Sequence, residues 1–232
     1  MSLTFGILCF PDVQQLDLTG PYEVFATVRS ARVHLVGKER APVRSSTGLW
    51  LTPDTTFADA PPFDVLCVPG GAGVNALLTD PDTLAFVRRQ AATARYVTSV
   101  CTGALVLGAA GLLRGKRATT HWNAHDFLAH FGAIPVRERV VRDGALITAG
   151  GVTSGIDFGL TVMAELVGRA EAEAIQLILE YAPAPPFQAG TPEEAPAAVV
   201  ELVRQRLSAS RAEREAILSA LPPGGADTGR EG

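Results

Sequence analysis

Residues 96–108 read YVTSVCTGALVLG, and this stretch decides the fold. Its first half, Tyr96 to Val100, is apolar and β-branched, which is typical of a buried strand. Its second half, Gly103 to Gly108, contains Ala and Leu between glycines and indicates a buried helix. Cys101 therefore stands where a strand turns sharply into a helix. That geometry is the nucleophile elbow of α/β enzymes, and Gly103 suits the tight turn.

A side chain at such a joint lies on top of the sheet, where it faces the first free N–H groups of the following helix and the positive end of its dipole. We therefore expect the Cys101 thiol to favour its thiolate form, which is the nucleophile. The alternative is a small buried cysteine that only fills space, because free cysteines are among the most buried residues.

Composition sets the class of protein. The chain has 232 residues, of which 47% are hydrophobic, so it can bury the core of one large α/β domain or two small ones. The formal net charge of −4 is spread along the chain, without the basic stripe that nucleic-acid binding requires. Apolar runs are interrupted well before they reach transmembrane length, and residues 1–4 lack the positive start of a signal peptide.

The three cysteines, Cys9, Cys67 and Cys101, are an odd number without metal-type spacing. Cys9 and Cys67 fall inside apolar strand-like runs, so we expect both to pack in the core. A reduced cytoplasmic protein follows as the default expectation.

Alternating strands and helices predict one three-layer α/β domain with a mostly parallel sheet. The apolar run 3–10 indicates a central strand, and 32–37 and 64–69 indicate two more. His34 alternates within the second of these and is expected to be structural. Asp80 and Pro81 open a helix that runs to about residue 94, and residues 140–148 form a hairpin around an Asp-Gly turn.

Asp17 follows the first strand, at the edge of a parallel sheet where ligands bind. Thr19 or Gly20 can cap a helix with Pro21 in its first turn, which would leave Asp17 in the preceding loop. Its leucine neighbours on both sides suggest a partly desolvated carboxyl with a raised pKa. An equally open alternative is an Asp that only hydrogen-bonds loop amides.

The strand at 64–69 runs into Gly70 and Gly71, where backbone N–H groups can approach a ligand. We interpret this turn as a donor of oxyanion-type hydrogen bonds, with a plain tight turn as the alternative. Its spacing is not that of a dinucleotide-binding loop. His121 and His125 are four residues apart, but no Glu stands between them in the zincin pattern, so no metal is expected.

The C-terminal part is predicted to differ from the rest. Prolines at 183–186 end the compact domain, which gives boundaries of 1–190 for the α/β domain and 191–221 for a final helix. This amphipathic helix, from about Pro192 to Ala220, should pack across the domain or onto a second subunit. Residues 222–232 are rich in Gly and polar residues and are predicted to be disordered.

Five segments together resemble the ThiJ/PfpI superfamily, whose fold is that of class I glutamine amidotransferases. The resemblance implies a flavodoxin-like α/β/α sandwich over about residues 3–190, a homodimer, and His121 near the thiol. The segments are QLDLTGP at 15–21, VPGG at 68–71, SVCTGA at 99–104, THW at 120–122, and TAGG at 148–151 with TSGID at 153–157.

Within the superfamily, Asp17 before Leu-Thr-Gly-Pro and the pair Cys101-Thr102 resemble the isonitrile hydratase branch. The resemblance implies hydration of an isonitrile, a small-molecule substrate, to an N-substituted formamide, without cofactor or metal. Peptidases of the superfamily carry Cys-His at the elbow. Thr102 takes the place of that His here, which argues against peptidase chemistry.

We hypothesise that Cys101 attacks the isonitrile carbon while Asp17 protonates it, and that water then releases the formamide with Asp17 as base. Backbone N–H groups of Thr102 and Gly71 would stabilise developing charge, and the Thr102 hydroxyl would orient water or Asp17. Ile156 and Trp122 are expected as apolar pocket walls.

Two other function classes stay open. One is a cysteine-dependent redox or carbonyl-stress protein, which would show oxidation of Cys101 or activity on glyoxals. The other is a non-catalytic small-molecule sensor. Some AraC-type regulators carry the same motifs before a helix-turn-helix domain, which this sequence does not show.

Overall fold

The computed structural model describes residues 2–224 and contains a seven-stranded sheet in the order β10-β11-β7-β6-β1-β2-β5. Every neighbouring pair is parallel except β10 and β11, so the predicted mostly parallel sheet is confirmed. The strands are β1 (Leu3–Leu8), β2 (Ala31–Gly37), β5 (Thr55–Thr56), β6 (Val65–Val68), β7 (Tyr96–Val100), β10 (Val140–Asp143) and β11 (Leu146–Ala149).

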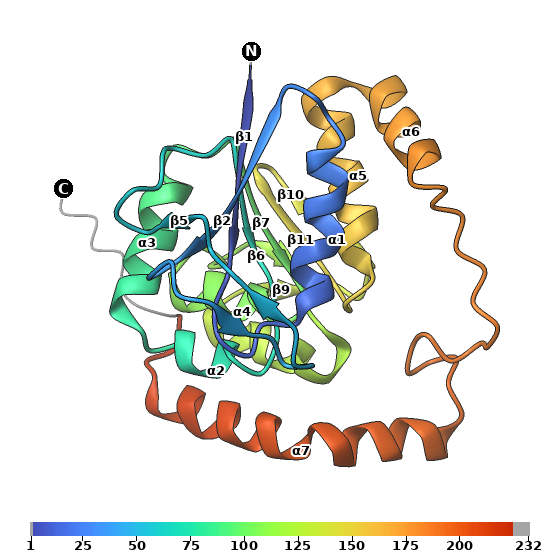
Figure 1. Ribbon diagram of the computed structural model, residues 1–232. Helices are drawn as coiled ribbons and strands as arrows, with labels where there is room; N and C mark the ends of the chain where they lie inside the picture. Colours follow the sequence, from blue (N-terminus) through green and yellow to red (C-terminus); the bar gives the residue numbers. More distant parts are fainter. Residues whose placement is uncertain (1, 225–232) are drawn as a thin grey trace.

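Helices cover both faces of this sheet (Figure 1). On one face lie α1 (Gln15–Ala26) and α5 (Ser154–Val167), which pack on each other, followed by α6 (Arg169–Ile178). On the other face lie α2 (Val74–Leu77), α3 (Pro81–Ala91), α4 (Gly103–Ala109) and the 3-10 helix η1 (Trp122–Phe131). Two small sheets complete the domain: β3 (Val43–Arg44) with β4 (Trp50–Leu51), and β8 (Arg117–Ala118) with β9 (Ile134–Pro135).

The core joins the sheet to the α1–α5 layer through aromatic rings. Phe5 of β1 stacks on Phe25 of α1 with ring centroids 4.4 Å apart, and Phe25 meets Phe158 of α5 edge-on at 5.9 Å. All three side chains are fully buried. Such pairs stabilise by about 0.5–1.5 kcal/mol beyond the area that they bury. They fix α1, and with it the residues at its start, against the centre of the sheet.

The start of α1 is one point at which the sequence prediction was wrong. The helix begins at Gln15, not after Thr19 or Gly20, so Asp17 lies in its first turn and not in a loop. Its N-cap, Gln14, has extended backbone and no side-chain cap, but its N–H donates to Gly70 O at 2.8 Å. The helix therefore starts without the side-chain cap that the sequence rules look for, and a tertiary hydrogen bond fixes the residue that precedes it.

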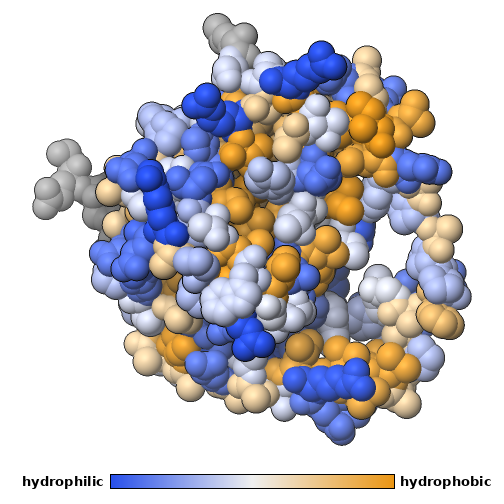
Figure 2. All heavy atoms as spheres, in the orientation of Figure 1, coloured by the Kyte–Doolittle hydropathy of each residue, from blue (hydrophilic) through white to orange (hydrophobic). Residues whose placement is uncertain are grey.

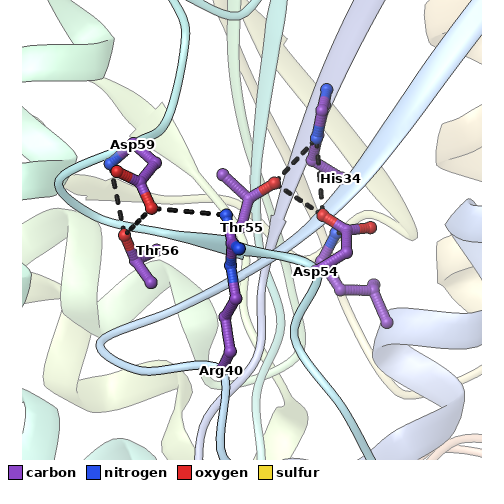
Figure 3. Close-up of polar contacts among 7 residues, drawn as sticks. His34, Arg40, Asp54, Thr55, Thr56 and Asp59 are labelled. Carbon is purple, nitrogen blue, oxygen red and sulfur yellow. Dashed lines mark hydrogen bonds and ion pairs between the residues drawn. The ribbon is translucent and has the colours of Figure 1, made fainter.

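A polar cluster holds the short edge strand β5 to β2, and Figure 3 shows its members. The Thr55 hydroxyl donates to Asp54 Oδ1 at 2.6 Å, and its oxygen lies 2.8 Å from His34 Nδ1. Because β2 and β5 pair over only two residues, these bonds reinforce a short ladder. His34 therefore has the structural role that was predicted for it.

The last helix is α7 (Ala197–Ala220), which lies across one end of the molecule (Figure 1). In Figure 1 it runs beneath α2 and α4, reached from α6 by a long excursion of the chain. Arg211 binds Asp126 of η1 with both guanidinium nitrogens at 3.0 and 2.7 Å, and Asn75 of α2 donates to Ser210 O at 3.0 Å. The helix therefore packs on its own domain.

Beyond α7, the Gly224 N–H donates to His130 O at 2.8 Å, so the chain is still attached to η1 at this point. The rest of the tail that was predicted to be disordered lies outside the described residues. Within residues 2–224, no helix combines the length and apolarity needed to cross a membrane.

Candidate active site

Cys101 occupies a nucleophile elbow between β7 and α4. Its φ angle is 55°, a left-handed conformation that non-glycine residues rarely adopt and that functional sites often contain. The backbone around it is fully bonded: the Cys101 N–H donates to Ala149 O at 3.0 Å and to Gly150 O at 2.8 Å, and the Thr120 hydroxyl donates to Cys101 O at 2.7 Å. These bonds hold the strained residue in place at the sharp turn between strand and helix that the sequence predicted.

The Asp17 carboxyl lies against the Cys101 thiol, and both are buried. Asp17 is 0% exposed, and its Oδ2 accepts a hydrogen bond from the Gly70 N–H at 2.9 Å. Its Oδ1 is buried without a further partner of hydrogen-bond geometry among residues 2–224. Burial raises the pKa of Asp17 from 3.8 to about 7, although the hydrogen bond from the Gly70 N–H and the adjacent Cys101 thiol oppose this rise. The predicted desolvated carboxyl is thus present.

The predicted preference of Cys101 for the thiolate is wrong for the resting site. Burial, and then the negative charge of Asp17, raise the pKa of the Cys101 thiol well above its ordinary value. The Thr102 N–H and hydroxyl favour the thiolate but do not outweigh these two effects. Near neutral pH the pair therefore holds a thiol beside a carboxyl group that is close to its pKa.

Gly70 brings Asp17 and Thr102 together because it has no side chain. A Cβ at this position would lie 2.6 Å from Thr102 N, 2.7 Å from Thr102 Oγ1 and 2.8 Å from Asp17 Oδ2, all closer than real Cβ contacts. Glycine is therefore required here for the close approach of the Asp17 carboxyl to Thr102, whereas the sequence indicated only that the backbone of this turn could approach a ligand.

The role predicted for Gly71 needs correction. Its N–H donates to Thr102 Oγ1 at 3.1 Å, so it is already used and does not face the cavity as a free oxyanion donor. The same contact fixes the Thr102 hydroxyl beside the thiol. Of the two backbone donors expected from the sequence, the Thr102 N–H is the one directed at the sulfur.

The thiol opens into a cavity of about 240 Å³. Cys101 is only 6% exposed, yet it forms part of the cavity wall together with Thr102 and Gly71. The other lining residues come from several loops and from α7: Gln14, Ser46, Ala72, His121, Asn123, Ala124, Val152, Leu207, Ser210, Arg211 and Arg214.

Two predicted pocket walls lie elsewhere. Ile156 is in the first turn of α5, where its Cγ1 lies 3.3 Å from the position of a Cβ on Gly20, so it packs between α5 and α1. Trp122 starts η1 and packs beside the His121 ring, with centroids 5.6 Å apart. Val152, in the loop before α5, faces the cavity in their place.

His121 lines the cavity as an uncharged group. Its Nδ1 accepts from the Asn123 N–H at 3.3 Å, which places any ring proton on Nε2. Burial and the positive charge of Arg214 lower its pKa to about 4. His125, by contrast, contacts Val136 O through Nε2 at 3.0 Å and does not line the cavity. The two imidazoles therefore face different surroundings.

Sequence reasoning missed the contribution of α7. Leu207, Ser210, Arg211 and Arg214 follow one another at helical spacing and all line the cavity. That spacing was visible in the sequence, but nothing local indicated that this face of α7 meets the elbow. Arg214 is the unexpected member of this set, because it is 4% exposed and positively charged.

A second cavity of about 540 Å³ lies beside β1 and α2 and includes Cys9. Burial raises the pKa of Cys9 to about 12, and likewise that of Cys67, in agreement with the packing role predicted for both. We place the active site in the smaller cavity, because its cysteine stands on the strained elbow and lies against the carboxyl of Asp17.

The protein is a three-layer α/β sandwich with a cysteine on an elbow and an aspartate from its first helix beside that cysteine. These features place it in the class of α/β proteins with a cysteine at the centre of the site. The chain belongs to the DJ-1/PfpI family, which it matches over residues 5–165. It is 64% identical over 210 residues to an isonitrile hydratase from Pseudomonas putida, across 90% of this chain and 92% of that protein.

Solved structures agree with this assignment. A ThiJ/PfpI family protein from Pseudomonas syringae superposes with a TM-score of 0.91 at 43% identity, over 94% of this chain and 91% of that one. DJ-1beta from Drosophila melanogaster superposes with a TM-score of 0.71 at 25% identity, over 79% of this chain and 100% of that one. The family resemblance and the fold class inferred from the sequence are therefore confirmed.

Proposed function

We propose that the protein is an isonitrile hydratase, which adds water to an isonitrile and gives an N-substituted formamide. The observation that carries this proposal is the Asp17 carboxyl held against the Cys101 thiol at the wall of the cavity. Extensive identity to the Pseudomonas putida isonitrile hydratase supports it.

The first step joins the thiol to the isonitrile. The Cys101 sulfur attacks the terminal carbon, and the Asp17 carboxylate takes the thiol proton and delivers it to the same carbon. The sulfur–carbon and carbon–hydrogen bonds form, and the carbon–nitrogen triple bond becomes a double bond. The product is a thioimidate on Cys101, with Asp17 again ionised.

Water completes the reaction. Asp17 takes a proton from water as the oxygen bonds to the thioimidate carbon, and that proton passes to nitrogen. The tetrahedral species then loses the sulfur, while the hydroxyl proton returns through Asp17 to Cys101. The Thr102 N–H faces the sulfur and stabilises charge on it, and such a donor typically contributes about 3 kcal/mol.

The arrangement favours this chemistry over peptide hydrolysis. A peptidase needs an imidazole that protonates the leaving amine. Here the elbow places Thr102 next to the nucleophile, and the nearby His121 has a pKa of about 4 and accepts a backbone hydrogen bond. A single carboxyl that moves one proton to carbon is sufficient for an isonitrile.

The experiment is direct. Purified protein is incubated with cyclohexyl isocyanide, and N-cyclohexylformamide is measured for the natural chain and for Cys101→Ala, Asp17→Val and the control Cys9→Ala. Formation of the formamide that disappears in the first two variants and persists in the third supports the proposal. Near-full activity without either Cys101 or Asp17 would refute the mechanism. Turnover of glyoxals but not of isonitriles would favour the carbonyl-stress alternative.

We further propose a homodimer in the cytoplasm. Figure 2 shows apolar surface where α5 and α6 lie, and Leu177 and Ile178 of α6 are 80% and 69% exposed. Apolar side chains of this size in one patch often mark a contact with another subunit. All three cysteines are free, which is compatible with a reducing compartment. Sedimentation analysis of Leu177→Glu against the natural chain tests the dimer.

A further inference from the structure

Arg214 is a buried cation on the wall of the cavity that contains Cys101. Its residue is 4% exposed, and among residues 2–224 it forms neither an ion pair nor a side-chain hydrogen bond. Its Nε is buried and unpaired. Burial of an unpaired charge is unfavourable, and most buried arginines are therefore paired with an anion.

Among residues 2–224, the neighbours of Arg214 do not supply that anion near neutral pH. A Cys101 thiolate would favour the guanidinium charge, but burial and Asp17 raise the pKa of this thiol well above its ordinary value, so it is uncharged at rest. The Glu213 carboxylate favours the charge of Arg214 only from beyond ion-pair distance, and it accepts a hydrogen bond from Asn75 at 2.7 Å. Arg211 is a cation already paired with Asp126. His121 is uncharged near neutral pH. The positive charge of Arg214 therefore remains available on the wall of the cavity that contains Cys101.

The helix that carries Arg214 is held firmly. Arg211, one turn earlier, binds Asp126 through two nitrogens and also donates to the Asn123 carbonyl, and its guanidinium lies over the Phe127 ring at 4.4 Å. The backbone of Ser210 is bound by Asn75 at 3.0 Å. Arg214 thus projects from a fixed part of α7, which is what recognition of a ligand group requires.

We propose that Arg214 binds a carboxylate on the substrate, so that the protein acts on isonitriles that carry an anionic group. The planar guanidinium matches a carboxylate through two parallel hydrogen bonds, which makes arginine selective for such groups. This inference rests on the proposed function for the reactive end of the substrate. It adds the chemical class of the other end.

The cavity is suited to such a molecule. Its volume of about 240 Å³ admits a small isonitrile, with Cys101 and Thr102 from one element and Arg214 from another. Ser46, Ser210 and Asn123 supply polar surface, while Val152 and Leu207 supply apolar surface for a short carbon chain. When the isonitrile carbon of such a substrate is bound at the sulfur, the carboxylate at its other end lies near Arg214. Among the described residues, Arg214 is the only arginine lining this cavity that is not ion-paired.

Two substrates of one shape test the idea: isocyanoacetate, which is charged, and isocyanoacetamide, which is neutral. The readout is the ratio of their kcat/KM values. In the natural chain the ratio should favour the anion. In Arg214→Gln it should fall about 100-fold, the effect of losing a charge-assisted bidentate bond. Arg214→Lys should retain part of the preference, and the exposed Arg206→Gln on the same helix should leave the ratio unchanged.

Product binding separates this inference from the proposed function. Calorimetry compares N-formylglycine with its neutral amide, and no turnover is needed. If the natural chain binds N-formylglycine more tightly than the amide, and Arg214→Gln loses this preference, the anion site is supported. This holds even if the protein does not turn over isonitriles, because absence of turnover would contradict only the proposed function. Equal losses on charged and neutral ligands, or no preference in the natural chain, would overturn the role of Arg214. Thermal melts of both Arg214 variants verify that they are folded.

Discussion

Replacing Asp17 with Asn should stabilise the folded protein and abolish its activity. Asp17 is fully buried, and its pKa of about 7 exceeds its ordinary value of 3.8 by about 3 pH units. Each pH unit between the folded and unfolded values corresponds to about 1.4 kcal/mol. Ionising Asp17 in the folded state therefore costs roughly 4 kcal/mol relative to the unfolded chain.

The sign follows from the two pKa values. Below pH 4 the carboxyl is protonated in both states and does not affect stability. Between pH 4 and pH 7 the unfolded chain ionises first, so the folded state loses stability as pH rises, and above pH 7 the loss is constant. Asn does not ionise and can still accept from the Gly70 N–H, so Asp17→Asn should gain up to about 4 kcal/mol over the natural chain by pH 8 and little at pH 4.

Urea unfolding at a series of pH values measures this gain. Asp143→Asn is the matched control of opposite sign, because the Arg117 N–H and Lys116 lower the pKa of Asp143 and its loss should destabilise above pH 4. A stability difference between Asp17→Asn and the natural chain that stayed constant from pH 4 to pH 8 would refute the reasoning. It would show that Asp17 ionises as easily in the folded protein as in the unfolded chain.

Two further predictions concern the same pair of side chains. Gly70→Ala should lower kcat/KM by roughly 10- to 100-fold, because a Cβ displaces Asp17 from its hydrogen bond. The control Gly190→Ala, where a Cβ meets nothing within 4 Å, should behave as the natural chain. Equal activities of the two variants would contradict the packing at Gly70. The kcat/KM for isonitrile hydration should rise with pH through about 7, as Asp17 ionises and becomes able to take the thiol proton, and a pH–rate profile without an inflection there would contradict this assignment.

The fold was largely predictable because its signals are local. Buried parallel strands give continuous apolar runs, and the sharp change of composition around Cys101 locates the elbow. The predicted strand at 64–69 corresponds to β6, and Asp80 caps α3 by accepting from the Thr83 N–H at 3.1 Å. These features depend on residues close in sequence, and so they are readable without the structure.

The errors arose where distant parts of the chain meet. The start of α1 depends on a hydrogen bond from Gln14 to Gly70, and the state of Cys101 depends on its burial and on Asp17. Arg214 enters the cavity only because α7 crosses the end of the domain. Spacing rules describe one element at a time, and contacts between elements determined each of these outcomes.

The resting state of Cys101 bears on which substrates the site can activate. The helix behind the elbow, α4, has only seven residues, so its favourable effect on a thiolate is small beside the effects of burial and of a neighbouring carboxyl. The sulfur and Asp17 therefore share one transferable proton near neutral pH. A carbonyl carbon accepts a nucleophile but no proton, whereas an isonitrile carbon accepts both. The same feature that makes Cys101 a poor general nucleophile thus suits it to a substrate that takes sulfur and proton at one atom.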